Sequence, residues 1–307
     1  MSGELAEKSS FFSIWPGEQR VFRPFRWISR IPEEKLVQRA AGVFTRIDPL
    51  MSRQHARRVR QVLGEQYAAI SASEPEFLAF EGASDLALNH LCGLPHETGH
   101  YYAYIPKHHG DRPLGAMVFL HGNAGNLKIF CHRWRNLAEN LGLAVLAPSN
   151  GFGFWGRNSA GVVSRALADL TARWPQIDQS KGLWLVGLSD GGNGVTRSAL
   201  TQPWHGLVYV SATMRAKELG QKEFREGWKN RPLLVLHGRA DHNVSPRMAE
   251  KSIEVLRQGG AEVSAEWYDK EDHFLTFGAA DAVDERIARW IRTSRTEPDR
   301  SSAAAFA

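Results

Sequence analysis

A serine, an aspartate and a histidine stand in this order along the 307-residue chain, each after a short apolar run. Ser189 lies in the pattern Gly-Leu-Ser-Asp-Gly, residues 187–191, between the apolar GLWLVG and a helical stretch. A strand, a sharp turn and a helix in succession can hold a serine hydroxyl above the edge of a sheet. Such a hydroxyl attacks carbonyl carbons once a base accepts its proton. Because glycines and serine also favour ordinary turns, the partners of Ser189 decide the interpretation.

Candidates for the acid and the base occupy loops after two later apolar runs. Asp241 follows RPLLVLHG, and His273 follows AEVSAEWY within DKEDHFLTF. The order serine, acid, histidine, with each residue just after a strand, is the order of this arrangement. Among the 12 histidines, His237 and His242 flank the acid and are the chief rivals of His273, whereas His121 comes too early in the chain. Each of these residues could otherwise be an ordinary loop residue.

Two backbone amides are candidates for binding the oxyanion that forms during acyl transfer. The sequence AMVFLHGNAGN places Asn123 directly after an apolar run, in a glycine-rich turn. The second amide belongs to Asp190, the residue after the candidate nucleophile. We expect the N–H groups of Asn123 and Asp190 to form an oxyanion hole.

The elements that must position these residues alternate along the chain. Seven short stretches have strand-like composition: HYYAYIP, GAMVFLHG, LAVLAPS, LWLVGLS, GLVYVSA, PLLVLHG and AEVSAEWYD. Helical stretches separate most of them, and several strands are continuous apolar runs, as is typical of strands buried on both faces. This alternation predicts an α/β fold with a mostly parallel sheet and helices on both faces.

Four motifs together resemble the α/β-hydrolase superfamily from about residue 98 to 295, roughly two thirds of the chain. HGNAGN, GLSDGG, GRADHNVSP and EDHF match its oxyanion loop, nucleophile elbow, acid loop and histidine loop in order. The chain is most similar to small carboxylesterases and to dienelactone-hydrolase-like or peptidase-like esterases, although dienelactone hydrolases proper carry cysteine where this chain has Ser189. One departure is Asp190, whose charge disfavours an anion nearby.

The resemblance implies a serine esterase that cleaves a small-molecule carboxylic ester or thioester through an acyl-enzyme, without cofactor or metal. The triad would be Ser189, Asp241 and His273. A serine peptidase of the same fold is the first alternative, and a non-catalytic ligand-binding protein with this fold is an alternative from another class. Only about 20 residues separate VYVSA from RPLLVL, which leaves little room for a cap domain.

The sequence GFGFWG, residues 151–156, matches the pattern G-x-G-x-x-G of dinucleotide-binding loops. Such a site also needs an acid at the end of the next strand, but the nearest candidate, Asp169, falls inside a helical stretch. We therefore favour a loop that lines an apolar substrate pocket through Phe152, Phe154 and Trp155.

The sequence His96-Glu97-Thr98-Gly99-His100 matches His-Glu-x-x-His, the pattern of zinc proteases. Zinc binding by this pattern requires a helix, because positions i and i+4 then share one face. Gly99 weakens a helix, and the strand-like YYAYIP follows. A turn that leads into a strand is therefore the favoured interpretation, with no metal between the two histidines.

The N-terminal segment is basic and aromatic. Residues 1–60 hold 12 Lys/Arg and 6 Asp/Glu, which accounts for the whole net charge of +5. Proline-broken FFSIWPGEQRVFRPFRW precedes two amphipathic stretches that begin at Pro32 and near residue 52. We expect a helical appendage over residues 1–75, a catalytic domain over 76–295 and a disordered tail over 296–307.

For this appendage we favour packing on the hydrolase body or on a second subunit over contact with an anionic membrane surface. The sequence is compatible with a homo-oligomer and does not decide the oligomeric state. Nucleic-acid binding is not expected, because no binding fold accompanies the basic residues. No apolar run reaches the length of a membrane span, and the N-terminus lacks a signal-peptide pattern, so the expected location is cytoplasmic. The two cysteines, Cys92 and Cys131, fit free thiols better than a disulfide.

Overall fold

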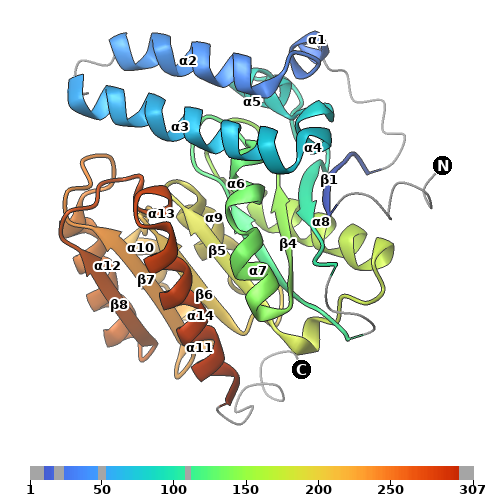
Figure 1. The fold of residues 1–307 in the computed structure, drawn as a ribbon. Helices are drawn as coiled ribbons and strands as arrows, with labels where there is room; N and C mark the ends of the chain where they lie inside the picture. The colour runs from blue at the N-terminus through green and yellow to red at the C-terminus, as the bar shows by residue number, and fades with distance from the viewer. Residues whose placement is uncertain (1–9, 17–23, 48–52, 108–111, 297–307) are drawn as a thin grey trace.

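The computed structural model describes residues 10–16, 24–47, 53–107 and 112–296 (Figure 1). Its centre is one sheet of eight strands in the order β1-β2-β4-β3-β5-β6-β7-β8. The strands β1 and β2 are antiparallel to their neighbours, and the six strands from β4 to β8 are parallel. The strands are β1 Phe11–Ile14, β2 Tyr101–Tyr104, β3 Gly115–Leu120, β4 Leu143–Pro148, β5 Leu183–Leu188, β6 Gly206–Val210, β7 Pro232–Gly238 and β8 Glu262–Tyr268.

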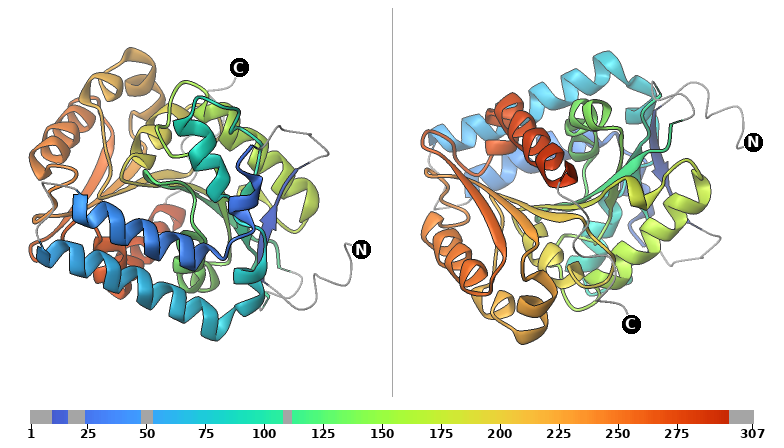
Figure 2. Two further views of the ribbon diagram at one scale, coloured as in Figure 1. Left: turned by 90° about the horizontal axis from the view of Figure 1, so that it is seen from above. Right: turned by 90° about the horizontal axis from the view of Figure 1, so that it is seen from below.

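Helices cover both faces of the sheet (Figure 2). One apolar cluster joins the sheet to α3, α6, α7 and α14, and a second joins it to α8, α11 and α12. The helices are α1 Arg26–Ser29, α2 Glu33–Ile47, α3 Arg53–Ser73, α4 Pro75–Ala79, α5 Ser84–Leu91, α6 Lys128–Arg133, α7 Arg135–Leu141, α8 Ser159–Arg173, α9 Gly191–Ser198, α10 Ala216–Leu219, α11 Lys222–Trp228, α12 Pro246–Gln258, α13 Leu275–Gly278 and α14 Ala280–Thr296, with a 3-10 turn at Gln179–Lys181.

The central strands explain the layered fold. Every residue of β3, β4, β5 and β6 is buried, as continuous apolar runs require when helices cover both faces. The seven predicted strands are confirmed as β2 to β8, and the predicted α/β architecture is confirmed with them. In the part of the chain that the structure describes, no helix is long and apolar enough to cross a membrane.

The N-terminal part differs from the expected appendage, because it completes the sheet. Residues 11–14 form the edge strand β1, which pairs with β2, and the Phe11 side chain is fully buried. Glu33, at the start of α2, is also buried and accepts a hydrogen bond from Tyr67 of α3 at 2.7 Å. Residue 75 is therefore not a boundary between independent cores. The expected tail lies outside the described residues, except for Thr296 at the end of α14.

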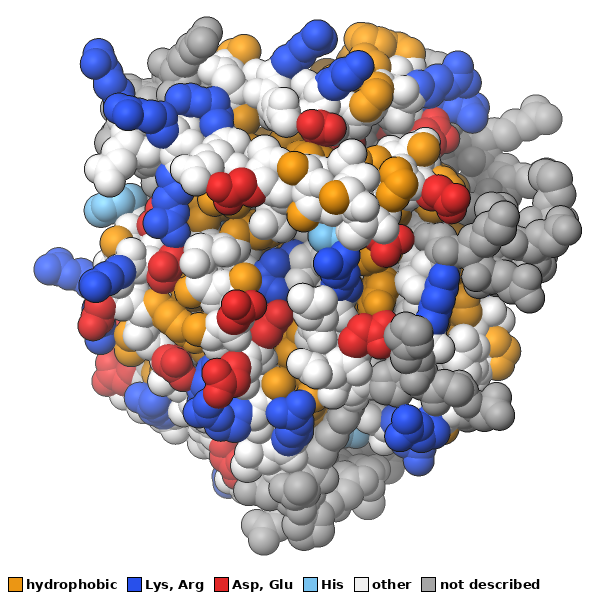
Figure 3. Space-filling view, in the orientation of Figure 1, with side chains coloured by type: hydrophobic (Ala, Val, Ile, Leu, Met, Phe, Trp, Pro, Cys, Tyr) orange, Lys and Arg blue, Asp and Glu red, His pale blue; other side chains and the backbone are white. Residues whose placement is uncertain are grey.

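The helices α2 and α3 run side by side at the edge of the sheet where the parallel strands end (Figures 1 and 2). Lys and Arg side chains gather on this part of the surface, with apolar side chains between them (Figure 3). Trp27 of α1 and Val43 of α2 are the most exposed large apolar residues of the described N-terminal part. The predicted basic character of the segment is thus displayed on the outer surface, while its inner side packs on the body.

Candidate active site

The strand β5 delivers Ser189 on a strained turn. Ser189 has a φ of 54°, which is unusual for a residue with a side chain, and α9 begins two residues later. A Cβ at Gly191 would lie 2.0 Å from the carbonyl oxygen of Leu120 on the neighbouring strand. Only glycine therefore fits there, and the turn from strand to helix has the sharpness that G-x-S-x-G predicts.

The loop after β3 lies directly against this turn. A Cβ at Gly122 would come within 2.8 Å of the Ser189 Cβ, so the two backbones are in close contact. Among the hydrogen bonds of the described residues, none uses the backbone N–H of Asn123 or of Asp190. Asn123 follows Gly122, which contacts Ser189, and Asp190 follows Ser189 directly, so both amides remain candidates for the oxyanion hole.

Both carboxylate oxygens of Asp190 accept hydrogen bonds. Its Oδ2 accepts a hydrogen bond from the Trp155 backbone N–H at 2.9 Å, and its Oδ1 accepts one from Asn193 Nδ2 at 2.7 Å. Hydrogen bonds to both oxygens fix the charge within the turn. The side chain that departs from the hydrolase pattern therefore fastens the elbow to the loop after β4.

Asp241 and His273 meet at the ends of the adjacent strands β7 and β8. His273 Nδ1 donates to Asp241 Oδ2 at 2.9 Å, and Asp241 Oδ1 accepts from the N–H groups of Asn243 and Val244 at 2.9 and 2.8 Å. Burial alone would raise the pKa of Asp241, but its bonds to His273 and Val244 outweigh burial and lower this pKa. A charged, fully paired aspartate orients the imidazole so that Nε2 is the free base.

The rival histidines do not take this place. His237 is fully buried and donates from Nε2 to the Val244 carbonyl at 3.0 Å, while burial lowers its pKa. His237 Nε2 lies 3.6 Å from Asp241 Oδ2, farther than the His273 nitrogen. His242 is exposed. The structure thus brings together Asp241 and His273, as the order of the motifs predicts.

Ser189 Oγ makes no hydrogen bond to any described residue, His273 included. Hydrogen bonds between nucleophile and base are often long in unliganded sites and tighten when substrate binds. The His273 side chain is 11% exposed and Ser189 is half-buried, so both are accessible from the carboxyl edge of the sheet.

His121, which the sequence analysis excluded as the catalytic base, connects the candidate oxyanion loop to the loop after β4. Its Nδ1–H donates to the Gly122 carbonyl at 2.7 Å, and its Nε2 accepts from the Asn150 N–H at 3.1 Å. Complete burial lowers the pKa of His121 to about 4. A neutral imidazole with one donor and one acceptor nitrogen is therefore locked between the loops after β3 and β4. Its only sequence signal is its place one residue before Gly122.

The three expected pocket residues separate into two groups. Phe154 is 51% exposed, adopts a φ of 46° and packs its ring 5.2 Å from that of Phe152. The loop that carries them touches the oxyanion loop, since Phe152 O accepts the Gly125 N–H at 3.0 Å. Trp155 instead is fully buried, and its Nε1 donates to the His121 carbonyl at 2.7 Å. Trp155 therefore supports the loops from the core and does not line an open pocket.

The two histidines of His-Glu-x-x-His do not share a helical face, because residues 94–100 form no helix. His100 is fully buried, with Nδ1 2.7 Å from Ser149 Oγ and Nε2 3.1 Å from Ser13 Oγ. The His96 ring stacks on that of His90 at 3.7 Å. Within the described ranges no group of three or more His, Cys, Asp or Glu side chains could hold a metal. The pattern lacks the geometry of a zinc site.

Asp169, the acid that a dinucleotide site would need, lies on α8. It accepts hydrogen bonds from the Tyr101 hydroxyl and from Arg173, both at 2.6 Å. This carboxylate therefore fastens a helix to the sheet. The glycines of GFGFWG belong to the loop after β4, and Gly153 in this loop lies against Gly122 and Asn123 of the candidate oxyanion loop.

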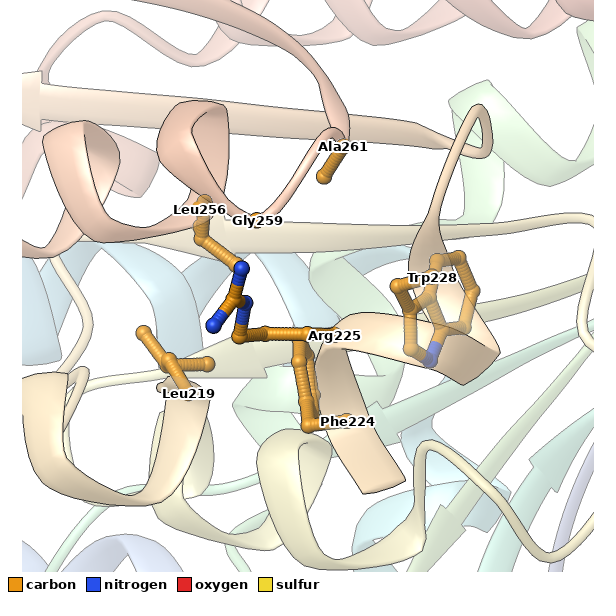
Figure 4. Close-up of a pocket in the computed structure, with 7 residues that line it drawn as sticks. All are labelled: Leu219, Phe224, Arg225, Trp228, Leu256, Gly259 and Ala261. Carbon is orange, nitrogen blue, oxygen red and sulfur yellow. The ribbon is translucent and has the colours of Figure 1, made fainter. Parts of the chain in front are cut away.

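Two pockets lie away from the candidate triad. The first is a small apolar pocket at the amino end of β8, lined by Leu219, Phe224, Arg225, Trp228, Leu256, Gly259 and Ala261 (Figure 4). The second is a groove of about 300 Å³ beside the start of β7, lined by Pro232, Glu262, Val263, Ser264, Trp290, Thr293 and Ser294. Neither includes a triad residue. In α/β sheets ligands bind at the carboxyl ends of strands, where the candidate nucleophile Ser189 lies.

Comparison with solved structures defines the class of this fold as that of the α/β-hydrolases. The esterase Pf2001 of Pyrococcus furiosus matches with a TM-score of 0.51 and 14% identity over 63% of this chain and 86% of its own. Est1E from Butyrivibrio proteoclasticus, solved with bound ferulic acid, matches with a TM-score of 0.50 and 13% identity over 64% of this chain and 94% of its own.

An acylaminoacyl peptidase in complex with Z-Gly-Gly-Phe-chloromethyl ketone has a TM-score of 0.50 and 14% identity over 64% of this chain. This chain spans only 39% of that longer protein. Residues 199–294 match the prolyl oligopeptidase family. No curated protein matches the sequence significantly. The fold expected from the four motifs is confirmed, and the matched proteins include both esterases and peptidases.

Proposed function

We propose that the protein is a serine hydrolase that cleaves a carboxylic ester, or a thioester, through an acyl-enzyme on Ser189. The observation that carries this proposal is the hydrogen bond of 2.9 Å between His273 and the buried Asp241. These two residues follow β8 and β7, which lie in the same sheet as β5, the strand that ends at the strained Ser189. The order of Ser189, Asp241 and His273 along the chain, each after a strand that ends at the same sheet edge, supports the proposal because acyl transfer on this fold uses that order.

In this mechanism His273 Nε2 takes the proton of Ser189 Oγ while Oγ bonds to the carbonyl carbon. The carbonyl oxygen becomes an oxyanion, which the N–H groups of Asn123 and Asp190 bind. The leaving alcohol or thiol takes the proton from the imidazolium as its bond to carbon breaks. Water then repeats both steps and releases the acid. Asp241 stays ionised and stabilises the imidazolium.

The short connection between β6 and β7 supports the ester interpretation, because it leaves little room for a cap domain over the edge of the sheet. Only 21 residues lie between the end of β6 and the start of β7 in the structure, and they form the short helices α10 and α11. We propose Phe154, whose ring packs on that of Phe152, as the apolar contact for the acyl or leaving group. Phe154 is exposed, and the residue before it, Gly153, lies directly against Asn123. Strained exposed residues concentrate at binding sites.

Serine peptidase activity is the second candidate, because the prolyl oligopeptidase match over residues 199–294 includes both Asp241 and His273. Turnover of p-nitrophenyl esters, thioesters and aminoacyl p-nitroanilides by the same preparation separates the two. We expect p-nitrophenyl butyrate to be hydrolysed and Ser189→Ala to be inactive. Faster turnover of anilides would favour the peptidase, and binding of esters without turnover would favour a non-catalytic protein.

Phe154→Ala should raise KM for an aromatic ester about 30-fold, since burial of an aromatic side chain contributes roughly 2 kcal/mol to binding. Leu200→Ala is the matched control, because Leu200 is similarly exposed, at 42%, and lies after α9, away from the loops of the site. Equal KM values for the two variants would remove Phe154 from the substrate contact.

A further inference from the structure

An ion-pair cluster joins the N-terminal helix α3 to the segment that carries His273. Arg58 Nη2 lies 2.8 Å from Glu271 Oε2, and Arg58 Nε lies 3.5 Å from Asp272 Oδ2. The two carboxylates belong to the residues directly before His273. Their side chains are 19% and 14% exposed, and that of Arg58 is 37% exposed. These pairs are therefore less screened than pairs on an open surface.

The backbone around His273 is built on the same two acidic residues. Asp272 Oδ1 accepts the Phe274 N–H at 2.9 Å, so its side chain bridges across His273 while its other oxygen faces Arg58. The Glu271 carbonyl accepts the Ala240 N–H at 3.0 Å, next to the candidate acid Asp241. The segment 271–272 thus connects the acid loop, the histidine and Arg58.

The ion pair of Arg58 and Glu271 packs tightly against α13. A Cβ at Gly278 would lie 2.2 Å from Arg58 Nη2 and 2.4 Å from Glu271 Oε2, so the ion pair rests on the Gly278 backbone. Arg133 of α6 holds the far side of the segment. It pairs with Asp284 at 2.9 Å and donates to the carbonyls of Thr276 and Ala280.

The helix that carries Arg58 is itself anchored to the oxyanion side. Tyr67 of α3 donates to Glu33 Oε1 at 2.7 Å, and the same oxygen accepts the Lys128 N–H, the first amide of α6, at 2.7 Å. Because α6 follows the oxyanion loop, one helix links both halves of the site. Its position therefore depends on Glu33 at one end and on Arg58 at the other.

We infer that Arg58 is a positioning residue, which holds His273 in register with Asp241 and Ser189 through Glu271 and Asp272. The inference rests on the proposed function, since it takes His273 as the base. Arg58 has a second effect through charge. Asp241 bonds to His273 and His237 lies close enough to interact with its charge, both from the β7 side. Glu271 and Asp272 directly precede His273, and Arg58 of α3 pairs with both of them. Without Arg58 the two unpaired carboxylates favour a positive charge on the neighbouring imidazole.

The test compares Arg58→Gln with Arg57→Gln, the neighbouring and exposed arginine of the same helix, in hydrolysis of p-nitrophenyl butyrate across pH. We expect Arg58→Gln to lower kcat about tenfold with KM within about twofold, less than the ~100-fold that a 1 Å misplacement produces. The acid limb of its kcat/KM profile should move to higher pH. Arg58→Lys, which keeps the charge, should restore the acid limb and only part of kcat.

Asp272→Asn gives a shift of opposite sign. This variant keeps an oxygen for the Phe274 amide but removes a negative charge, so its acid limb should move to lower pH. Opposite shifts in two variants cannot come from general loosening, and Asp272→Asn also provides the test if Arg58→Gln does not fold. Profiles of Arg58→Gln and Asp272→Asn that overlay those of wild type and Arg57→Gln overturn the inference. An inactive wild type overturns the proposed function instead.

Discussion

The buried His121 makes the free energy of unfolding depend on pH. Its pKa is about 4 in the folded protein, against an ordinary value of 6.5. Between these values the unfolded chain binds a proton that the folded chain excludes. Stability from this residue is therefore complete above about pH 6.5 and is lost as the pH falls towards 4. From pH 7 to pH 5 the loss amounts to about 2 kcal/mol.

Urea unfolding of wild type and His121→Asn at both pH values measures this contribution. The asparagine amide can donate to the Gly122 carbonyl but leaves the Asn150 N–H unpaired, which lowers stability at pH 7 by about 1–3 kcal/mol. The variant should nevertheless lose about 2 kcal/mol less than wild type on acidification. Other buried histidines, such as His132 with a pKa of about 4, contribute equally to both proteins.

His242→Asn is the matched control, because His242 is exposed and its variant should follow the wild-type curve. Parallel pH dependence of wild type and His121→Asn would refute the reasoning, since it would mean that His121 takes a proton in the folded protein.

Three further results are expected. Asp241→Asn should lower kcat by about 10³–10⁴-fold, because the amide no longer fixes the tautomer of His273; steady-state kinetics retaining more than a tenth of wild-type kcat would contradict the triad. Phe11→Ala should lower the free energy of urea unfolding by about 3–5 kcal/mol, whereas a change below about 1 kcal/mol would mean that β1 is a detachable appendage. A chelator should leave ester hydrolysis unchanged, and activity that disappears with chelation and returns with zinc would restore the metal hypothesis.

The sheet was largely predictable because its strands are continuous apolar runs that need burial on both faces. The strand β1 escaped prediction because FFSI is only four residues long and lies in a proline-broken, arginine-rich segment. Residues 11–14 become the edge strand of the sheet because they pair with β2, and local sequence does not specify this pairing. The short helices α4, α5, α10 and α13 likewise span too few turns to show a period of 3.6 residues.

The triad candidates could be located because each follows a strand, and parallel strands end at one edge of the sheet. The residues that support them could not be found in this way. Arg58 and Glu271 are 213 positions apart in the sequence, and the nearest partner of Trp155 Nε1 is a backbone carbonyl 34 positions away. Such contacts depend on tertiary packing, so residue type alone made Trp155 resemble a pocket residue.

The most direct test of the central claim is the labelling of Ser189 by a fluorophosphonate probe, located by peptide mass spectrometry. We expect one adduct per chain, on the peptide that contains Gly187–Gly191, with labelling abolished in Ser189→Ala and slowed strongly in Asp241→Asn. The probe reports the nucleophile without knowledge of the natural substrate. A wild-type protein that stays unlabelled, or an adduct that persists in Ser189→Ala, would contradict the serine hydrolase mechanism.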